Sequence, residues 1–181
     1  MNDRRAFLGL AGAGAAGLLL FGRSGRSAAS VRFPMNHTQA QWRQMLGAKR
    51  YAVLREAATE PPFSSPLLNE HRKGLFVCAG CARPLYSSAT KFESGTGWPS
   101  FTQPFADGHL KTIRDTSYGM VRTEIVCARC GAHQGHVYPD GPPPTGERYC
   151  INSVSLAFTP EGEPLPDKLG RGAPEGEPLA E

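Results

Sequence analysis

Two Cys-x-x-Cys pairs constrain the fold of this chain more than any other feature. They are Cys78 with Cys81 and Cys127 with Cys130, and residues 82–126 lie between them. Each pair has the spacing of half a tetrahedral zinc site, so the four thiolates predict a closed, structural Zn²⁺ centre with no open ligand position. Such a centre ties distant parts of the chain together, and metal binding then contributes free energy to folding.

Two other interpretations of these four cysteines stay open. They could form disulfides, which an exported protein permits, or one pair could be a redox-active Cys-x-x-Cys. Gly80 and Gly131 lie within or directly after the pairs, where a metal knuckle needs a tight turn. These glycines and the doubling of the pair favour zinc.

The composition indicates one compact, turn-rich domain with tails. The 181 residues include 21 glycines and 16 prolines, and 40% of them are hydrophobic. The net charge is +4, but residues 1–29 carry four arginines and one aspartate, so the remainder carries +1. No basic tract with interleaved aromatic residues is left, which argues against nucleic-acid binding.

Residues 1–29 have the pattern of an export signal. A twin-arginine start, Asp-Arg-Arg-Ala-Phe-Leu, precedes a glycine- and alanine-rich apolar stretch over residues 9–21, and small residues follow at 27–29. We expect the twin-arginine export machinery of a bacterium to deliver the folded protein to the periplasm or another extracytoplasmic site. The alternative is that the segment is kept as a membrane anchor.

The rest of the chain divides into a linker (30–37), a domain (38–159) and a tail (160–181). Thr38 and Gln41 resemble a capping box at the start of a helix, and a second short helix is expected over residues 49–58. The tail is rich in Pro, Gly and Glu and repeats Glu-Gly-Glu-Pro-Leu, a composition that cannot bury a core. We therefore expect it to be disordered.

Cys150 is the fifth cysteine and has no partner. It lies in an alternating run, residues 149–158, whose period of two predicts a strand with Cys150, Asn152 and the apolar residues after them on one face. An unpaired thiol beside a polar amide is typical of a nucleophile. The alternative is a buried cysteine that packs as a small hydrophobe.

Two histidines and one tryptophan are further candidates for the site. His133 and His136 lie between the second pair of cysteines and Cys150, and at least one is expected to act as a general acid beside the thiol. Trp98 lies in a glycine-rich loop, residues 94–101, where an indole could form the wall of an apolar pocket. It could equally be a core aromatic residue.

Five motifs now carry a resemblance. Cys-x-x-Cys, Ser-Gly-Thr-Gly-Trp-Pro-Ser-Phe, a second Cys-x-x-Cys, His-x-Gly-His-Val and Pro-Thr-Gly-x-Arg-Tyr-Cys-Ile-Asn-Ser occur in the order seen in B-type methionine sulfoxide reductases. The resemblance covers about residues 38–158. It implies a mainly β fold, with two antiparallel sheets around a zinc ribbon and short N-terminal helices. It also implies reduction of the R epimer of methionine sulfoxide, preferably within proteins, which repairs damage from oxidative stress.

The same resemblance assigns roles to individual residues. Cys150 resembles the nucleophile, which becomes a sulfenic acid, and His136 and Asn152 resemble the groups that hold and protonate the sulfoxide oxygen. Trp98 is similar to the aromatic residue that receives the substrate methyl, and His133 occupies the position of the second family histidine. The zinc ligands correspond to Cys78, Cys81, Cys127 and Cys130. Because the attacking species is a thiolate, the pKa of Cys150 is expected to be lowered by a protonated histidine or by Arg148.

One departure from the family concerns regeneration of the thiol. Many members have a resolving cysteine at the position of Thr96, and this chain has no sixth cysteine. We therefore expect an external thiol reductant, such as a thioredoxin-like protein, to reduce the sulfenic acid of a monomeric enzyme. The competing readings are a zinc-ribbon binding module with an inert Cys150, and a thiol peroxidase.

Overall fold

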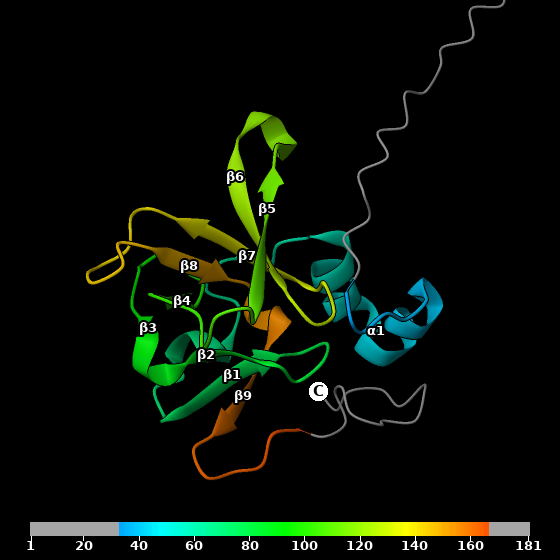
Figure 1. Cartoon of the computed structure of the whole chain (residues 1–181), viewed down its shortest axis with the longest axis horizontal. Helices are drawn as coiled ribbons and strands as arrows, with labels where there is room; N and C mark the ends of the chain where they lie inside the picture. Colours follow the sequence, from blue (N-terminus) through cyan, green and yellow to red (C-terminus); the bar gives the residue numbers. More distant parts are fainter. Residues whose placement is uncertain (1–32, 167–181) are drawn as a thin grey trace, which may run out of the picture. The chain divides into compact units, whose positions relative to one another are not determined.

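The computed structural model describes residues 33–166. In that part the chain forms two antiparallel sheets, one α-helix and four short 3-10 helices (Figure 1). None of the helices within these residues is long and apolar enough to cross a membrane. The expected mainly β architecture with two antiparallel sheets is thus confirmed. The expected signal, residues 1–29, lies outside the described residues, as does the tail beyond residue 166.

Helix α1 (Gln39–Glu56) begins at the expected capping box. Thr38 Oγ1 accepts a hydrogen bond from the Gln41 N–H at 3.2 Å, and Gln41 Oε1 accepts one from the Thr38 N–H at 2.8 Å. Gly47 has a φ of 67°, which interrupts the helix and divides it into the two expected segments. The left-handed Ala57 caps its end.

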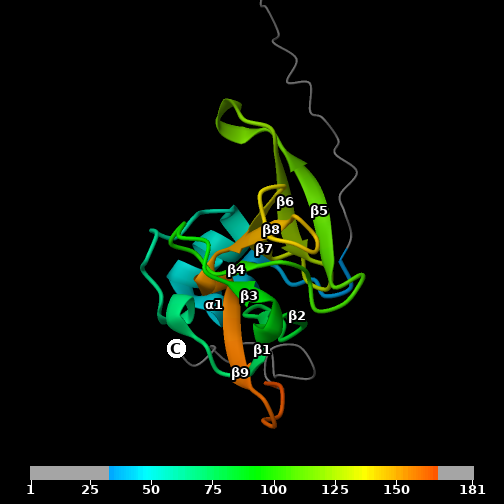
Figure 2. The same ribbon diagram turned by 90° about the vertical axis from the view of Figure 1, so that its left-hand side faces the viewer.

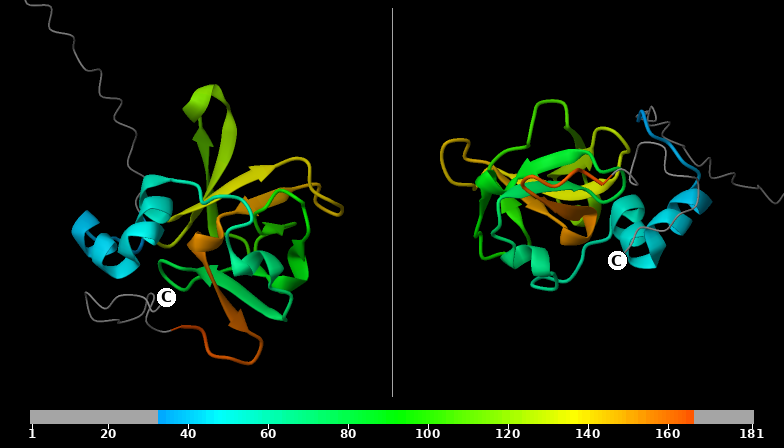
Figure 3. Two further views of the ribbon diagram at one scale, coloured as in Figure 1. Left: turned by 180° about the vertical axis from the view of Figure 1, so that it is seen from behind. Right: turned by 90° about the horizontal axis from the view of Figure 1, so that it is seen from below.

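The buried face of α1 joins the helix to the rest of the domain. Its buried side chains are apolar and comprise Trp42, Met45, Leu46, Tyr51, Val53 and Leu54. The helix packs against β7 and the 3-10 helix η4, and Figure 3 shows it to one side of the sheets. Arg55 near its end donates from Nη1 to the carbonyl of Cys130 at 2.9 Å, so the helix is also anchored to the second cysteine pair.

The smaller sheet has the strand order β2-β1-β9. These strands are β1 (Gly74–Cys78), β2 (Pro84–Ser87) and β9 (Leu156–Pro160). Phe76 of β1 is fully buried and packs edge-on against Phe101 of the other sheet, with ring centroids 5.0 Å apart. Aromatic packing therefore forms part of the core between the two sheets.

The larger sheet has the order β3-β4-β8-β7-β6-β5. Its strands are β3 (Lys91–Phe92), β4 (Ser100–Phe101), β5 (Leu110–Asp115), β6 (Arg122–Cys127), β7 (His133–Tyr138) and β8 (Arg148–Ile151). The hairpin of β5 and β6 extends away from the other strands (Figure 1). The 3-10 helices are η1 (Pro66–Asn69), η2 (Ser88–Thr90), η3 (Ser117–Gly119) and η4 (Ser153–Ser155).

The single strand expected over residues 149–158 is wrong. The chain leaves β8 after Ile151, turns through Asn152 and η4, and enters β9 in the other sheet (Figure 2). The N–H groups of Ser153 and Val154 bond the carboxylate of Glu60 in place of a neighbouring strand. The side chain of one distant residue therefore satisfies two main-chain N–H groups at the point where the chain changes sheets. The alternating pattern of residues 149–158 gives no information about a hydrogen-bond partner as distant in the sequence as Glu60.

Candidate active site and metal centre

The four paired cysteines come together at one place. Their Sγ atoms all lie within 4.8 Å of one another, with 3.7 Å between Cys78 and Cys130 and 3.6 Å between Cys81 and Cys127. All four are buried, and the distances are far too long for a disulfide, which is about 2.05 Å. A tetrahedral zinc with Zn–S bonds of about 2.3 Å places its sulfur ligands about 3.8 Å apart. The donor set and its geometry therefore fit Zn²⁺.

The candidate metal centre lies where strands of the two sheets end. Cys78 ends β1 of the smaller sheet and Cys127 ends β6 of the larger one. In the first turn the N–H of Cys81 bonds the carbonyl of Cys78 at 3.2 Å, and in the second the N–H of Gly131 bonds the carbonyl of Cys127 at 2.9 Å. A bound metal would thus fix two strands that no β ladder joins.

Cys150 lies outside this cluster, on the central strand β8. It pairs with His136 of β7 on one side and with Ser100 of β4 on the other. Its thiol is partly exposed, and Sγ lies 3.8 Å from Oγ1 of Thr96. The thiol is therefore held by regular strand pairing and is still accessible.

The glycine-rich loop supplies the hydroxyl groups beside the thiol. Thr96 Oγ1 lies 2.9 Å from Ser94 Oγ, which lies 2.7 Å from Oγ of the buried Ser100. Gly95 and Gly97 have φ of 72° and 90°, as expected for a loop with unusual dihedrals. The loop places Thr96 where a hydrogen bond to Sγ is possible.

A cavity of about 160 Å³ opens beside Cys150. Its wall is formed by Thr59, Trp98, Arg122, Gly135, His136, Tyr138, Cys150, Ile151 and Asn152. Four of the five expected site residues thus meet at one cavity. Pockets for drug-sized ligands measure about 300–1,000 Å³, so this one has the size for a single side chain.

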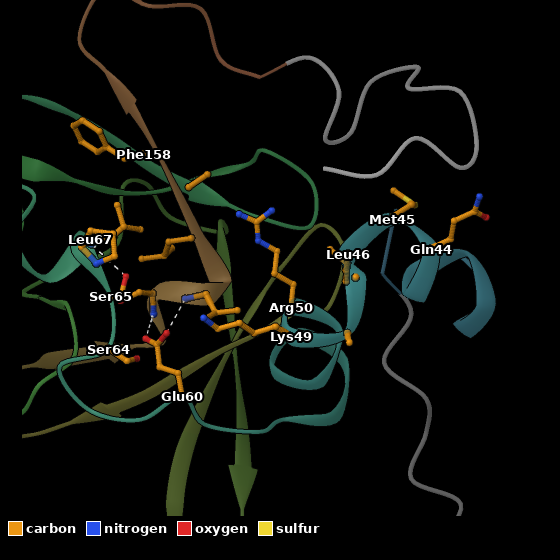
Figure 4. A pocket seen from close by; sticks show the side chains of 17 residues that line it. Gln44, Met45, Leu46, Lys49, Arg50, Glu60, Ser64, Ser65, Leu67 and Phe158 are labelled. Carbon is orange, nitrogen blue, oxygen red and sulfur yellow. Dashed lines mark hydrogen bonds between the residues drawn. The ribbon is translucent and has the colours of Figure 1, made fainter. Parts of the chain in front are cut away.

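A larger depression of about 770 Å³ lies between α1 and the η4–β9 segment (Figure 4). No cysteine, histidine or tryptophan lines it. It therefore offers no nucleophile or proton donor of the kind that the smaller cavity contains.

His136 is oriented by an acidic partner. Its Nε2 lies 2.9 Å from Oδ2 of Asp115, and the same oxygen accepts a hydrogen bond from Arg122 at 2.6 Å. The other carboxylate oxygen, Oδ1, accepts one from the N–H of Ser117 at 2.9 Å. Hydrogen bonds from Ser117, together with those from His136 and Arg122, hold the pKa of Asp115 well below its usual range. The carboxylate is therefore ionised and accepts the Nε2–H, so Nδ1 is the nitrogen that can exchange a proton.

The protonation states of the thiol and the imidazole differ from the expectation. Burial raises the pKa of the Cys150 thiol, and the Thr96 hydrogen bond and the charge of Arg148 offset this only in part. Burial likewise lowers the pKa of His136, against the opposing effect of Asp115. The expected lowered pKa of Cys150 is thus wrong for the resting site, because the desolvation of the thiol outweighs the nearby positive charge.

Trp98 and Asn152 both bond the main chain of Glu60. Trp98 Nε1 donates to the carbonyl oxygen of Glu60 at 3.1 Å. The N–H of Glu60 donates to Asn152 Oδ1, also at 3.1 Å. Asn152 is buried and also donates from Nδ2 to the carbonyl of Gln134 at 3.3 Å. Trp98 is only partly buried and faces the cavity, so it is not solely a core residue.

The structure does not bring His133 to the cavity wall. The residue is 4% exposed, its Nδ1 lies 2.6 Å from Oε1 of Glu124, and its ring centroid is 5.7 Å from that of His136. His133 therefore lies next to His136 but is not among the residues that line the cavity.

Several residues of the site were missed from the sequence. Thr59 and Glu60 stand before two prolines at the end of a helix, in a stretch without any catalytic motif. Asp115 and Arg122 do leave a signal, because opposite charges on either side of a Gly-containing turn indicate the closing pair of a hairpin. The structure pairs these two residues directly across β5 and β6.

Comparisons with known proteins show the family to which the chain belongs. Residues 46–160 match the family model of the SelR domain. A peptide methionine sulfoxide reductase MsrB of Caulobacter vibrioides is 59% identical over 127 residues, which cover 70% of this chain and 80% of that protein. Another, from Bradyrhizobium diazoefficiens, is 56% identical over 124 residues, which cover 68% of this chain and 89% of that one. The chain therefore belongs to the SelR domain family of B-type peptide methionine sulfoxide reductases.

Proposed function

We propose that this protein reduces the R epimer of methionine sulfoxide in oxidised proteins, by attack of Cys150 on the sulfoxide sulfur. One observation carries the proposal. An accessible thiol, an imidazole, a carboxamide and an indole line one cavity of side-chain size. No residue of the metal centre lines it, so a zinc ion held by those four buried thiolates would have a structural role.

The reaction balances with the one proton that the resting pair holds. Cys150 Sγ attacks the sulfoxide sulfur and forms a transient bond between the two sulfur atoms. The oxygen then moves to Sγ, so that the S–O bond of the substrate and the transient sulfur–sulfur bond break and an Sγ–O bond forms. The substrate sulfur gains two electrons, Cys150 loses two, and the products are methionine and a cysteine sulfenic acid. His136 Nδ1 takes the thiol proton and delivers it to the sulfoxide oxygen, which otherwise leaves poorly. Positioned acid catalysis of this kind contributes about 10²–10⁴-fold.

Asn152 and Trp98 hold the two ends of the sulfoxide. Asn152 Nδ2 bonds Gln134 with one hydrogen and has a second for the sulfoxide oxygen. The half-buried indole of Trp98 offers an apolar face to the substrate methyl. Because oxygen, methyl and sulfur then have three fixed places, only one epimer leaves its remaining substituent pointing out of the cavity.

The surroundings of the cavity support a polypeptide substrate. The tip of the β5–β6 hairpin exposes Tyr118 and Val121, at 89% and 69%, next to the cavity residue Arg122. Phe63 is 67% exposed and donates its N–H to the carbonyl of Gly97, the residue before the cavity tryptophan. Apolar groups thus flank an opening that admits one side chain, where chain segments of an oxidised protein can pack.

An external thiol completes the cycle. Thr96 Oγ1 lies 3.8 Å from Sγ, and its hydroxyl cannot form a disulfide. One thiol of the reductant attacks the sulfenic sulfur and releases water, and a second restores Cys150 and leaves the reductant as a disulfide. A thioredoxin-like protein or a small dithiol supplies both equivalents.

The experiment that tests the proposal compares the two epimers. Dabsyl-labelled methionine R-sulfoxide and S-sulfoxide are each incubated with the protein and dithiothreitol, and methionine formation is followed. We expect turnover of the R epimer alone. Turnover of the S epimer at a comparable rate, or of neither, would refute it. Hydrogen peroxide serves as the control substrate, since a thiol peroxidase would consume it and the proposed reductase would prefer the sulfoxide.

The place of action is a further part of the proposal. The twin arginines at residues 4 and 5, followed by an apolar stretch, support export to the periplasm by the twin-arginine machinery as a folded monomer. Fractionation of bacteria that express the full chain checks this. We expect periplasmic protein, and cytoplasmic accumulation when Arg4 and Arg5 are both changed to Lys. Equal distributions of the two forms would contradict it.

A further inference from the structure

Glu60 is a buried carboxylate in a loop without a catalytic motif. It is 6% exposed, and its carboxylate accepts hydrogen bonds from the N–H of Ser153 and, at 3.2 Å, from the N–H of Val154 (Figure 4). Burying a charge is costly unless hydrogen bonds satisfy it. Glu60 therefore holds the first turn of η4, directly after β8, in place.

The main chain of the same residue contacts two groups of the proposed active site. Its N–H donates to Asn152 Oδ1 at 3.1 Å, and its carbonyl oxygen accepts from Trp98 Nε1 at 3.1 Å. The side chain fixes the loop to the segment after Cys150, and the backbone then orients the carboxamide and the indole. One residue thus connects the proposed oxygen site with the proposed methyl site.

These contacts determine how both groups are presented. An N–H bonded to Asn152 Oδ1 prevents the carboxamide from flipping, so that Nδ2 is the donor that remains for the substrate. The bond at Nε1 fixes the rotation of the Trp98 indole. The next two residues, Pro61 and Pro62, have restricted φ and keep the loop stiff. Glu60 itself is not among the residues that line the cavity.

We infer that Glu60 is a positioning residue. It determines which alkyl group on the substrate sulfur the site accepts, and in which orientation the site binds the sulfoxide oxygen. It acts through Trp98 and Asn152 and does not touch the sulfoxide. This inference rests on the proposed function. It predicts that a change at Glu60 alters selectivity at the methyl site, while the reactivity of the thiol stays unchanged.

The test uses Glu60→Gln in the full-length, zinc-loaded protein. The amide keeps the shape of the side chain but offers one acceptor oxygen where two N–H groups need partners. Reduction of methionine R-sulfoxide is compared with that of its S-ethyl homologue. One methylene in an apolar pocket is worth about 10–200-fold in kcat/KM, and we expect Glu60→Gln to reduce the methyl preference by about tenfold.

A second readout separates positioning from a structural role. We expect the rate of Cys150 alkylation by iodoacetamide and the zinc content to stay within about twofold of the wild type, because Thr96 and Arg148, not Glu60, act on the thiol. The matched control is Glu56→Gln, which removes a carboxylate that pairs with Arg43 on the exposed face of α1. Glu56→Gln should change neither the rate of Cys150 alkylation nor the zinc content.

The outcomes are distinguishable. If the wild type reduces neither epimer, the proposed function fails and this inference with it. If the wild type is active and Glu60→Gln keeps the methyl preference, or loses alkylation, zinc and both activities in parallel, only the inference is refuted.

If Glu60→Gln does not fold, Glu60→Asp replaces it, since the carboxylate remains but is withdrawn by about 1.5 Å. A methyl preference equal to that of the wild type in Glu60→Asp refutes the inference.

Discussion

At the scale of single residues, the proposed chemistry depends on which of two groups, Cys150 or His136, holds one proton. Burial raises the pKa of Cys150 and lowers that of His136, so the resting pair is a thiol beside a neutral imidazole. The sequence correctly places both residues in one site, but it carries no information about desolvation. For that reason the direction of the two pKa shifts could only come from the structure.

The pH dependence of reduction follows from this pair. Below the pKa of His136 the imidazole is already protonated and cannot take the thiol proton, so the rate falls. Above the pKa of Cys150 no proton remains for the sulfoxide oxygen, so the rate falls again. The ordinary pKa values of the two groups are roughly 6.5 and 8.5. We expect kcat/KM to be level between these pH values, and the level region to extend beyond both because the pKa of His136 is lowered and that of Cys150 is raised.

Alkylation of Cys150 by iodoacetamide is the control for this profile. It needs only the thiolate, so its rate should rise steadily through the same range. His136→Asn should lose the level region and about 10²–10⁴-fold in rate. A reduction rate that rises in parallel with alkylation would contradict the proton arrangement.

At the scale of helices and strands, the sequence predicted those features that depend on interactions between residues near in sequence. The capping box of α1 was predicted because hydrogen bonds between residues near in sequence define it. The path from β8 to β9 was not, since its turn depends on Glu60, a residue far away in the sequence. For the same reason, the sequence did not predict the role of residues such as Glu60, whose contacts are with residues distant in the sequence.

The loop that carries Trp98 gives a matched pair of variants. Gly95 and Gly97 both have positive φ, but a Cβ at Gly97 would lie 2.6 Å from the Cβ of Pro62, whereas one at Gly95 would have nothing within 4 Å. Both changes to Ala carry backbone strain of about 1–2 kcal/mol. We expect Gly97→Ala to lower the free energy of unfolding by about 1–3 kcal/mol more than Gly95→Ala, because of this overlap.

Denaturant unfolding and sulfoxide reduction measure the difference. Gly97→Ala should also lose activity, since the overlap displaces the tryptophan beside it. Gly95→Ala should stay close to the wild type in activity once its lower stability is taken into account. Equal effects of the two variants would show that the contact with Pro62 does not position the loop.

At the scale of the whole molecule, the four-cysteine cluster joins the two sheets, which no β ladder connects. Cys78 and Cys127 end strands of different sheets, and the sequence already indicated that the pairs join distant segments. Their spacing predicted that the four cysteines would meet, and the structure brings their Sγ atoms within 4.8 Å of one another. The arrangement of the sheets around the cluster came from the resemblance, and no spacing in the chain alone would have given it.

Removal of the metal should therefore unfold the domain and not merely inactivate it. Structural zinc contributes about 10–16 kcal/mol in small zinc domains, which matches or exceeds the 5–15 kcal/mol stability of a typical protein. We expect a strong chelator in mild denaturant to abolish the far-ultraviolet circular dichroism of the sheets as one zinc per chain is released. Cys150→Ser should keep its zinc and its fold. A folded, metal-free protein would contradict the structural role.

The most direct test of the central claim is the mass of the cysteines after one turnover without reductant. The protein is mixed with excess methionine R-sulfoxide, trapped with dimedone and digested. We predict one methionine formed per chain, one dimedone adduct on Cys150, and no disulfide. Methionine formed with Cys150 unmodified, or with Cys150 bonded to another cysteine of the chain, would contradict the account.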